Sequence, residues 1–252
     1  MATPLIEFSS VTKSFGARVV LRDLSLSVAR GETLTILGAS GSGKSVMLKL
    51  LIGLERADGG SIRAFGEEVI GLGEEALAPL RRRVSMMFQG GALFDSLSAA
   101  ENVAYPLRLR KVVDEALIAE RVRTVLALVG LPGIEELAPA SLSGGMRKRL
   151  ALARAIVAEP DVVLYDEPTT GLDPVNSRRI VDLIRSIQSR LGITSLVVTH
   201  DMAAAFLVAD RMAMISDGVV LAALPTEEFR KSEQPAIHEF ISAMSASPRR
   251  PS

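Results

Sequence analysis

The sequence has no cysteine and only two histidines among its 252 residues. The absence of cysteine excludes disulfide bonds, thiolate zinc sites and cysteine nucleophiles, and it fits a reducing compartment. The scarcity of histidine argues against a metal centre built from imidazole ligands. Enzymes that depend on such groups are therefore not expected.

Net charge is lacking as well. The chain contains 29 basic and 29 acidic residues and its pI is about 6.8, so no overall positive field favours nucleic acid or an anionic membrane surface. Two basic clusters have no aromatic residues between them, which indicates solvated helix faces and no nucleic-acid partner. These clusters are Arg81-Arg82-Arg83 and the group Arg147, Lys148, Arg149 and Arg154.

Long apolar runs are missing too. The first residues lack the basic stretch and apolar run of a secretory leader, and nowhere do about 18 uncharged apolar residues follow one another. Even so, 48% of the residues are hydrophobic, only 4% are aromatic, and the mean hydropathy is +0.30. We expect this apolar excess in the core or on a surface that meets a protein partner.

Short apolar runs are present at residues 33–37, 84–88, 162–165 and 195–199. Such runs are typical of strands that are buried on both faces, and therefore of a parallel sheet in an α/β fold. Between the last two runs, Asp173 and Pro174 form a helix start and Gly192 forms a helix stop. This pattern predicts a crossover helix between the two strands.

The remaining chain falls into three regions. Residues 1–30 include alternating apolar and polar side chains, which predict antiparallel strands. Residues 92–159 contain no convincing strand but carry two helical stripes of apolar residues, so we expect a helical insertion in the α/β core. Beyond residue 225 the pattern indicates a short helix followed by a tail.

A glycine-rich segment with the pattern G-x-x-x-x-G-K-[ST] lies between a predicted strand and a predicted helix. Its glycines let backbone N–H groups point at one anion, and the helix N-terminus adds partial positive charge. Lys44 would reach the β- and γ-phosphates, and the Ser45 hydroxyl would bind Mg²⁺. A glycine-rich turn without function is the alternative, which the flanking strand and helix disfavour. We expect a nucleoside triphosphate site at Gly38, Ala39, Ser40, Gly41, Ser42, Gly43, Lys44, Ser45 and Val46.

Two carboxylates, Asp166 and Glu167, follow the predicted strand at residues 162–165. The C-terminal ends of strands are where ligands bind in such sheets. In the general scheme of P-loop enzymes, Asp166 would hold Mg²⁺, directly or through water, and Glu167 would polarise the attacking water. An acidic pair alone more often caps a helix, but together with the phosphate loop it predicts nucleotide hydrolysis.

The pentad Leu142-Ser143-Gly144-Gly145-Met146 resembles the signature of ABC-transporter ATPases, and the order of further motifs matches that family over about residues 5–225. By this resemblance, Phe15 corresponds to the aromatic residue that stacks on adenine. Gln89 corresponds to the Q-loop, Asp173 to the D-loop and His200 to the H-loop. Met146 departs from the usual glutamine and Phe15 from the usual tyrosine, but the glycine N–H groups and an aromatic face remain.

The resemblance implies an α/β fold: a P-loop NTPase (RecA-like) core with a mainly parallel sheet, an N-terminal antiparallel β subdomain and an inserted α-helical signature subdomain. It implies one ABC ATPase domain over residues 1–252. We expect its nucleotide-binding core at residues 1–91 and 160–224, its helical subdomain at 92–159, and a C-terminal helix and tail at 225–252.

The resemblance also implies a head-to-tail homodimer with two ATP molecules and Mg²⁺ at its interface. Ser143, Gly144, Gly145 and Asp173 would contact the nucleotide held by the other subunit. This agrees with the chemistry of Ser143 and two glycines at a helix start, which favours anions. His200 would donate a hydrogen bond near the γ-phosphate as a neutral imidazole. Gln89 would meet the metal and the attacking water while sensing a membrane partner.

Residues 85–97 and 101–107 look like the ATPases of Mla-type systems, which work with MCE-domain proteins to move phospholipid between bacterial membranes. This likeness implies an integral-membrane permease that docks near Ala92 to Leu97, and an MCE-domain protein in the same system. In some such systems a STAS-domain regulatory subunit is also present. The ATPase would then lie in the cytoplasm, on the inner membrane. The alternative is that Leu93 and Phe94 merely pack the helical insertion.

Three functions remain open from the motifs. The first is an ATPase that drives a lipid-transporting permease, the second an ATPase of an importer for a small polar solute such as an amino acid, and the third a soluble ABC-type ATPase acting on DNA or the ribosome. The C-terminal stripe of Ile237, Phe240 and Ile241 is also open. It would dock on its own core, on the other subunit or on a STAS-domain partner.

Overall fold

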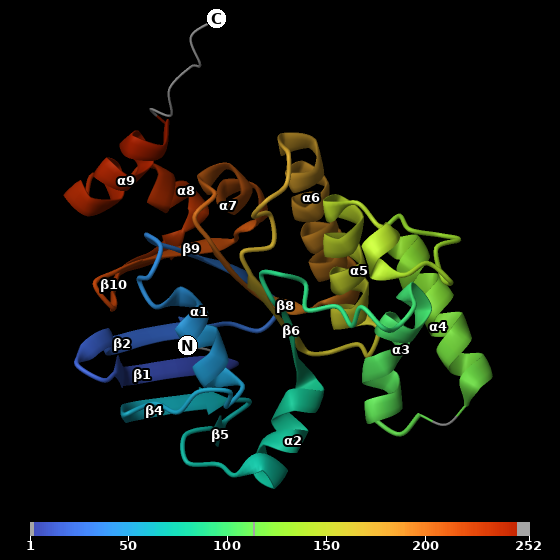
Figure 1. Ribbon diagram of the computed structural model, residues 1–252. Helices are drawn as coiled ribbons and strands as arrows, with labels where there is room; N and C mark the ends of the chain where they lie inside the picture. The colour runs from blue at the N-terminus through green and yellow to red at the C-terminus, as the bar shows by residue number, and fades with distance from the viewer. Residues whose placement is uncertain (1–2, 113, 246–252) are drawn as a thin grey trace, which may run out of the picture.

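The computed structural model describes residues 3–112 and 114–245. Figure 1 shows the N-terminal strands at the left of the view and the helices α3, α4 and α5 at the right, with β6 and β8 between them. Within the described ranges, none of the helices combines the length and the apolar composition of a membrane-spanning segment.

A six-stranded sheet forms the centre of the fold, in the order β10-β9-β3-β8-β7-β6. Neighbouring strands are parallel, except for β9 and β10. Every residue of β3, β7 and β8 is buried, which explains why these strands stand out as apolar runs. The predicted mainly parallel α/β fold is thus confirmed. The strands are β3 (Thr33–Leu37), β6 (Val84–Met87), β7 (Val162–Asp166), β8 (Thr194–Thr199), β9 (Arg211–Ser216) and β10 (Val219–Pro225).

A four-stranded antiparallel sheet, in the order β2-β1-β4-β5, contains the N-terminal strands. Leu24, Leu26 and Val28 alternate with exposed residues along β2 and are buried, as the sequence pattern predicts. The strands are β1 (Ile6–Phe15), β2 (Arg18–Val28), β4 (Gly59–Ala64) and β5 (Glu67–Glu68).

Helix α6 has the ends that the sequence predicts. Its N-cap is Asp173, whose side chain accepts a hydrogen bond from the backbone N–H of Asn176, and it stops at Gly192, which has a φ of 64°. The apolar stripe of the helix, including Ile180 and Ile187, is buried. The helices outside the insertion are α1 (Lys44–Leu51), α2 (Glu74–Arg83), α6 (Pro174–Leu191), α7 (Met202–Val208), α8 (Thr226–Arg230) and α9 (Pro235–Ser245).

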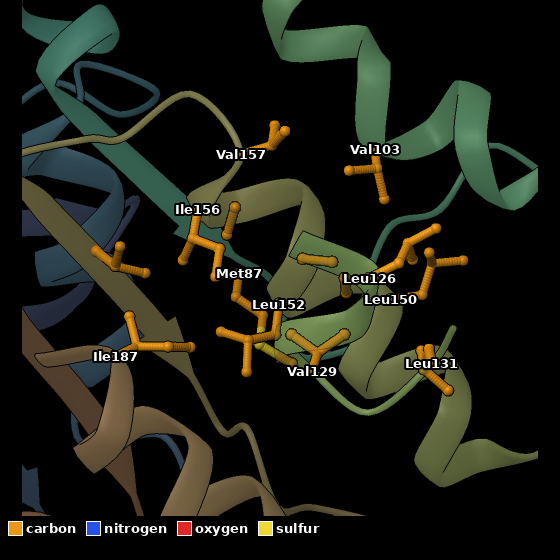
Figure 2. Close-up of a cluster of buried hydrophobic side chains, with 14 of the residues drawn as sticks. Met87, Val103, Leu126, Val129, Leu131, Leu150, Leu152, Ile156, Val157 and Ile187 are labelled. Carbon is orange, nitrogen blue, oxygen red and sulfur yellow. The ribbon is translucent and has the colours of Figure 1, made fainter. Parts of the chain in front are cut away.

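The chain between β6 and β7 forms helices α3 (Ala99–Leu109), α4 (Glu115–Leu128) and α5 (Gly144–Ile156), with a short 3₁₀ turn, η1 (Pro139–Ser141). Figure 2 shows the cluster that holds this insertion together: Leu126 from α4 and Leu152 from α5 lie in one cluster with Met87 of β6 and Ile187 of α6. Helix α5 therefore packs both on the other inserted helices and on the central core.

Helix α9 packs on its own chain. Ile237 is fully buried and belongs to a cluster with Leu37, Met202 and Phe229, so α9 contacts the layer that carries α7. Phe240 and Ile241 pack against the same cluster. Of the three docking surfaces considered for this stripe, the structure shows the first: the stripe packs on the core of its own chain.

We expect Ile237→Ala to weaken the docking of α9. Removing three buried side-chain carbons from such a site costs about 2–5 kcal/mol of stability, which would raise amide exchange in α9 more than tenfold if that helix opens separately. Hydrogen exchange read by mass spectrometry measures this effect. Leu109→Ala is the control, because Leu109 is 67% exposed. Unchanged exchange in α9 of Ile237→Ala would contradict the docking.

Candidate functional site

The glycine-rich loop connects the end of β3 to the start of α1. Gly43 is the N-cap of α1 and has a φ of 99°. A Cβ atom at Gly43 would lie 2.5 Å from Cδ2 of Leu21 and 3.0 Å from the carbonyl oxygen of Val20. Only glycine satisfies both the backbone conformation and this close approach. The sharp turn that aims the start of α1 at the cavity is therefore fixed by this residue.

Lys44 is almost fully buried, with 6% of its surface exposed. Its ammonium donates hydrogen bonds to the carbonyl oxygens of Gly38 at 2.7 Å and Ala39 at 2.9 Å. Burial lowers the pKa of Lys44, and the nearby carboxylates of Glu167 and Asp166 oppose that shift. The loop thus curls around a cation that is placed to meet an anion.

Ser45 and Asp166 meet across the site. The Ser45 hydroxyl donates to Oδ1 of Asp166 at 2.6 Å. Burial and the neighbouring Glu167 raise the pKa of Asp166, whereas the bond from Ser45 lowers it. These are hard oxygen atoms of the kind that Mg²⁺ prefers. The residues described here include no group of three or more His, Cys, Asp or Glu that could hold a metal alone, so Mg²⁺ at this pair would need further oxygen ligands, as a phosphate group supplies.

Glu167 lies at the end of β7, where three polar side chains reach its Oε2. His200 Nδ1 is 2.9 Å away, the Thr170 hydroxyl donates at 3.0 Å, and the Thr199 hydroxyl donates at 3.5 Å. Strands β7 and β8 are neighbours, which is why residues after each strand meet here. The carboxylate is held in one orientation.

The backbone of Glu167 has an unusual conformation. Its φ is 50°, in the left-handed region that costs a residue with a Cβ roughly 1–2 kcal/mol. Its N–H donates to the carbonyl oxygen of Val198 at 2.9 Å. Such strain persists only where surrounding contacts enforce it, and it is frequent at functional sites.

A cavity of about 590 Å³ opens over these groups, a size that suits a nucleotide. Phe15 forms part of its wall and is 45% exposed, so it does not belong to the core. The lining residues are Phe15, Arg18, Val20, Ser40, Gly41, Gly43, Lys44, Ser45, Val46, Gln89, Glu167 and His200.

Two of these lining residues, Arg18 and Val20, are absent from the sequence-based site. They lie on β2, and Arg18 pairs with Phe15 across the Gly16 turn. An Arg18 guanidinium N–H donates to the Gly41 carbonyl oxygen at 3.5 Å. The period-2 alternation of a strand that starts beside Phe15 is the signal that could have identified them.

The signature residues and Asp173 do not line this cavity in the part of the chain that the structure describes. Ser143 is the N-cap of α5 and accepts a hydrogen bond from the N–H of Met146 at 3.2 Å. A Cβ atom at Gly145 would lie 2.9 Å from the side chain of Asn176, which donates to Asp173. The starts of α5 and α6 thus form a second polar surface, on which Ser143 and Gly144 are exposed.

The interpretation of the second basic cluster as a solvated helix face is wrong for Lys148. This residue is 8% exposed, and its ammonium donates to the carbonyl oxygens of Gln89 and Glu167. The neighbouring Arg147 is exposed. Arg154 is also drawn inward, with hydrogen bonds to the carbonyl oxygens of Gly91 and Ala92 at 2.7 Å each.

The phosphate loop ends in lysine and serine, and an aspartate and a glutamate follow one another at the end of β7. Together with a second glycine-rich helix start, these features define an ATP-binding cassette ATPase. Comparison with known proteins agrees. The sequence profile of the family described as "ABC transporter" matches residues 21–170. The chain belongs to the ABC transporter family, as its motifs predict.

Two relatives of known sequence are similar to this chain over nearly its whole length. The chain is 38% identical over 247 residues to the methionine import ATP-binding protein MetN of Brucella abortus. This alignment covers 96% of this chain and 66% of that protein. It is 40% identical over 243 residues to the probable ribonucleotide transport ATP-binding protein mkl of Mycobacterium tuberculosis, covering 96% of this chain and 68% of that protein. The chain thus spans about two thirds of the length of these relatives.

Solved structures support the same assignment. The dimeric, post-hydrolysis structure of the ATP-binding cassette MJ0796 with ADP and Pi has a TM-score of 0.81 and 30% sequence identity, over 88% of this chain and 98% of that chain. A second dimeric structure of MJ0796, described as a bacterial ABC transporter cassette, gives the same values. The predicted ATPase activity and the predicted ATP and Mg²⁺ are confirmed at the level of the family.

Proposed function

We propose that the cavity binds ATP with its base against Phe15 and its phosphates on residues 38–45. Lys44 would bind the β- and γ-phosphates, and Ser45, Asp166 and Gln89 would hold Mg²⁺. The buried ammonium of Lys44, the glycine turn at Gly43 and the 2.6 Å contact of Ser45 with Asp166 support these roles. Bound Mg²⁺ would neutralise charge on the phosphates.

Glu167 is the general base in this proposal. Its carboxylate is fixed by His200 and Thr170 and faces the cavity, so it is positioned to accept a proton from water that attacks the γ-phosphate. The Nδ1 atom of His200 lies 2.9 Å from Oε2 of Glu167. A neutral imidazole has a single N–H, so His200 would orient Glu167 before ATP binds and would turn that donor to the γ-phosphate when ATP is bound. Gln89, which lies on the cavity wall, would hold the attacking water.

We infer that a complete site needs two chains. Ser143, Gly144, Gly145 and Asp173 lie outside the nucleotide cavity within the described residues, yet Ser143 starts a helix whose N-terminus favours anions. A head-to-tail homodimer would bring this surface over the ATP of the other subunit. The dimeric state of MJ0796 in its solved structures supports the arrangement. The nucleotide-binding core would comprise residues 1–91 and 160–224, the helical subdomain residues 92–159, and the C-terminal helix and tail residues 225–252.

We propose that the chain drives phospholipid transport between bacterial membranes, through a separate permease and an MCE-domain protein. The resemblance of residues 85–97 and 101–107 to Mla-type ATPases supports the lipid substrate, and an apolar surface beside the Q-loop supports the docking of a permease. Phe94 and Tyr105 are 41% and 38% exposed, and their ring centroids are 4.7 Å apart. Leu93, in contrast, packs against the core of the insertion. A permease helix would dock on the exposed aromatic pair.

A groove near this surface supports the same docking. It has a volume of about 590 Å³ and lies between α2 and the end of α3. Leu54 and Leu109, two of its lining residues, are 50% and 67% exposed, and Arg81 and Arg110 line it too. We propose that the cassette sits on the cytoplasmic face of the inner membrane through this contact. A STAS-domain subunit would occupy a further surface in those systems that have one.

An importer for a small polar solute is the second candidate. It is favoured by the names of the relatives, which describe methionine import and ribonucleotide transport. The cassette chemistry is the same in both proposals, so only the partners separate them.

Purification of the native membrane complex through a tag on this chain tests the two proposals. We expect a permease, an MCE-domain protein and bound phospholipid, the last identified by mass spectrometry. The matched control is the same purification from cells that carry the chain without the tag. A complex with a periplasmic solute receptor and no bound phospholipid would contradict phospholipid transport and support the second candidate.

A further inference from the structure

Lys148 connects two parts of the site that are far apart in the sequence. Its buried ammonium donates to the carbonyl oxygen of Gln89, in the loop after β6, and to that of Glu167 at 3.2 Å. It therefore links the segment of the proposed metal and water ligand to the segment of the proposed general base. Lys148 itself lies on α5, the helix that begins at the signature.

Helix α5 holds the loop at more than one point. Arg154, about two turns further along the helix, donates to the carbonyl oxygens of Gly91 and Ala92. Both basic side chains thus bind backbone carbonyl groups of the loop. Only Lys148 also reaches Glu167. Both residues therefore hold the loop, but of the two only Lys148 also holds the backbone of Glu167.

The hydrogen bond to the Glu167 carbonyl constrains a residue whose backbone conformation is unusual. The backbone of Glu167 is in the left-handed region, with a φ of 50°, and its N–H is already bonded to Val198. A cation on the carbonyl oxygen fixes the other side of the same residue. Apolar residues fill most of the buried face of α5, so an ammonium there carries a desolvation cost that packing alone does not explain.

We propose that Lys148 is a positioning residue, which holds the Gln89 loop and the backbone of Glu167 in the arrangement required for hydrolysis and transmits movement of that loop to Glu167. This inference rests on the proposed role of Glu167 as general base. Lys148 would act through Glu167, because among the described residues it does not line the nucleotide cavity. Movement of the loop when a permease docks would therefore change the placement of the carboxylate.

Steady-state ATPase measurements on Lys148→Met test the proposal. We expect kcat to fall about 10- to 100-fold, because small displacements of a reacting group have effects of this size, while KM for ATP changes less than about twofold, since the ATP contacts remain. Lys148→Arg should recover part of kcat because it keeps a charged donor. Arg123→Met, an exposed basic residue on α4, should leave both parameters unchanged.

Arg154→Met separates the two roles of α5. It removes hydrogen bonds to the loop without touching Glu167, so we expect its kcat to fall less than that of Lys148→Met. An equal fall would overturn the link to Glu167. The Lys148→Met change in a Glu167→Gln chain reports on folding, and it should leave ATP-driven dimerisation intact. Loss of that dimerisation would overturn the proposal as well.

Failure of this inference is distinguishable from failure of the proposed roles. If wild type and Lys148→Met hydrolyse ATP at the same rate, the positioning role is wrong and the base assignment stands. If Glu167→Gln hydrolyses ATP at the wild-type rate, the base assignment is wrong, and the positioning role falls with it.

Discussion

Glu167→Gln is expected to lower kcat for ATP hydrolysis by roughly 10²–10⁴-fold, the range for loss of a general base. The amide has nearly the same shape, so the contacts of this side chain with His200 and Thr170 need only small adjustment. What it loses is the capacity to accept a proton from water. Release of phosphate under saturating Mg²⁺ and ATP measures the change.

A matched control for this substitution is Glu233→Gln, which makes the same chemical change at an exposed position between α8 and α9. Its kcat should equal that of the wild type. Binding of ATP to Glu167→Gln should also remain close to wild type, because the phosphate loop is unaltered. A Glu167→Gln protein with wild-type kcat would refute the base assignment.

Lys44→Ala is expected to weaken nucleotide binding roughly 10- to 100-fold. Its ammonium holds the Gly38 and Ala39 carbonyl groups, and a charge-assisted hydrogen bond contributes about 1.5–3 kcal/mol. The substitution removes the cation that would meet the phosphates and the group around which the loop folds. Equilibrium titration with a fluorescent ATP analogue measures the dissociation constant.

The control for this experiment is Lys231→Ala, at an exposed position after α8. It should bind the analogue as tightly as the wild type. Thermal unfolding of Lys44→Ala without nucleotide checks that weak binding does not reflect an unfolded chain. If the folded Lys44→Ala protein binds the analogue with wild-type affinity, Lys44 is not a phosphate ligand.

The sequence predicts well those parts of the site whose chemistry is local. The phosphate loop is recognisable because Gly43 and Lys44 must follow each other at a helix start. The buried strands β3, β7 and β8 are recognisable because both of their faces are apolar, and Asp166 and Glu167 follow directly from the end of β7.

Other parts depend on tertiary placement and leave little trace in the sequence. Strand β4 begins with Gly59 and Gly60, which lower strand propensity, and it forms because β1 pairs with it. Lys148 lies between Arg147 and Arg149, so the local pattern indicates a solvated face. Only the packing of α5 beside the end of β7 turns its ammonium toward Glu167.

A single chain does not bring the signature residues to its own nucleotide cavity within the described residues. The signature surface and the nucleotide cavity lie apart in the described residues, and each carries a helix N-terminus, which favours an anion. ATP shared between two chains would join these two sites. Blocking hydrolysis should therefore keep the chains together.

Sedimentation velocity of the Glu167→Gln protein, with and without Mg²⁺ and ATP, measures whether ATP joins two chains. We predict that the chain sediments as a monomer without nucleotide and as a dimer with Mg²⁺ and ATP, and that adding Lys44→Ala abolishes the dimer. A Glu167→Gln chain that binds ATP with wild-type affinity and still sediments as a monomer would contradict the account.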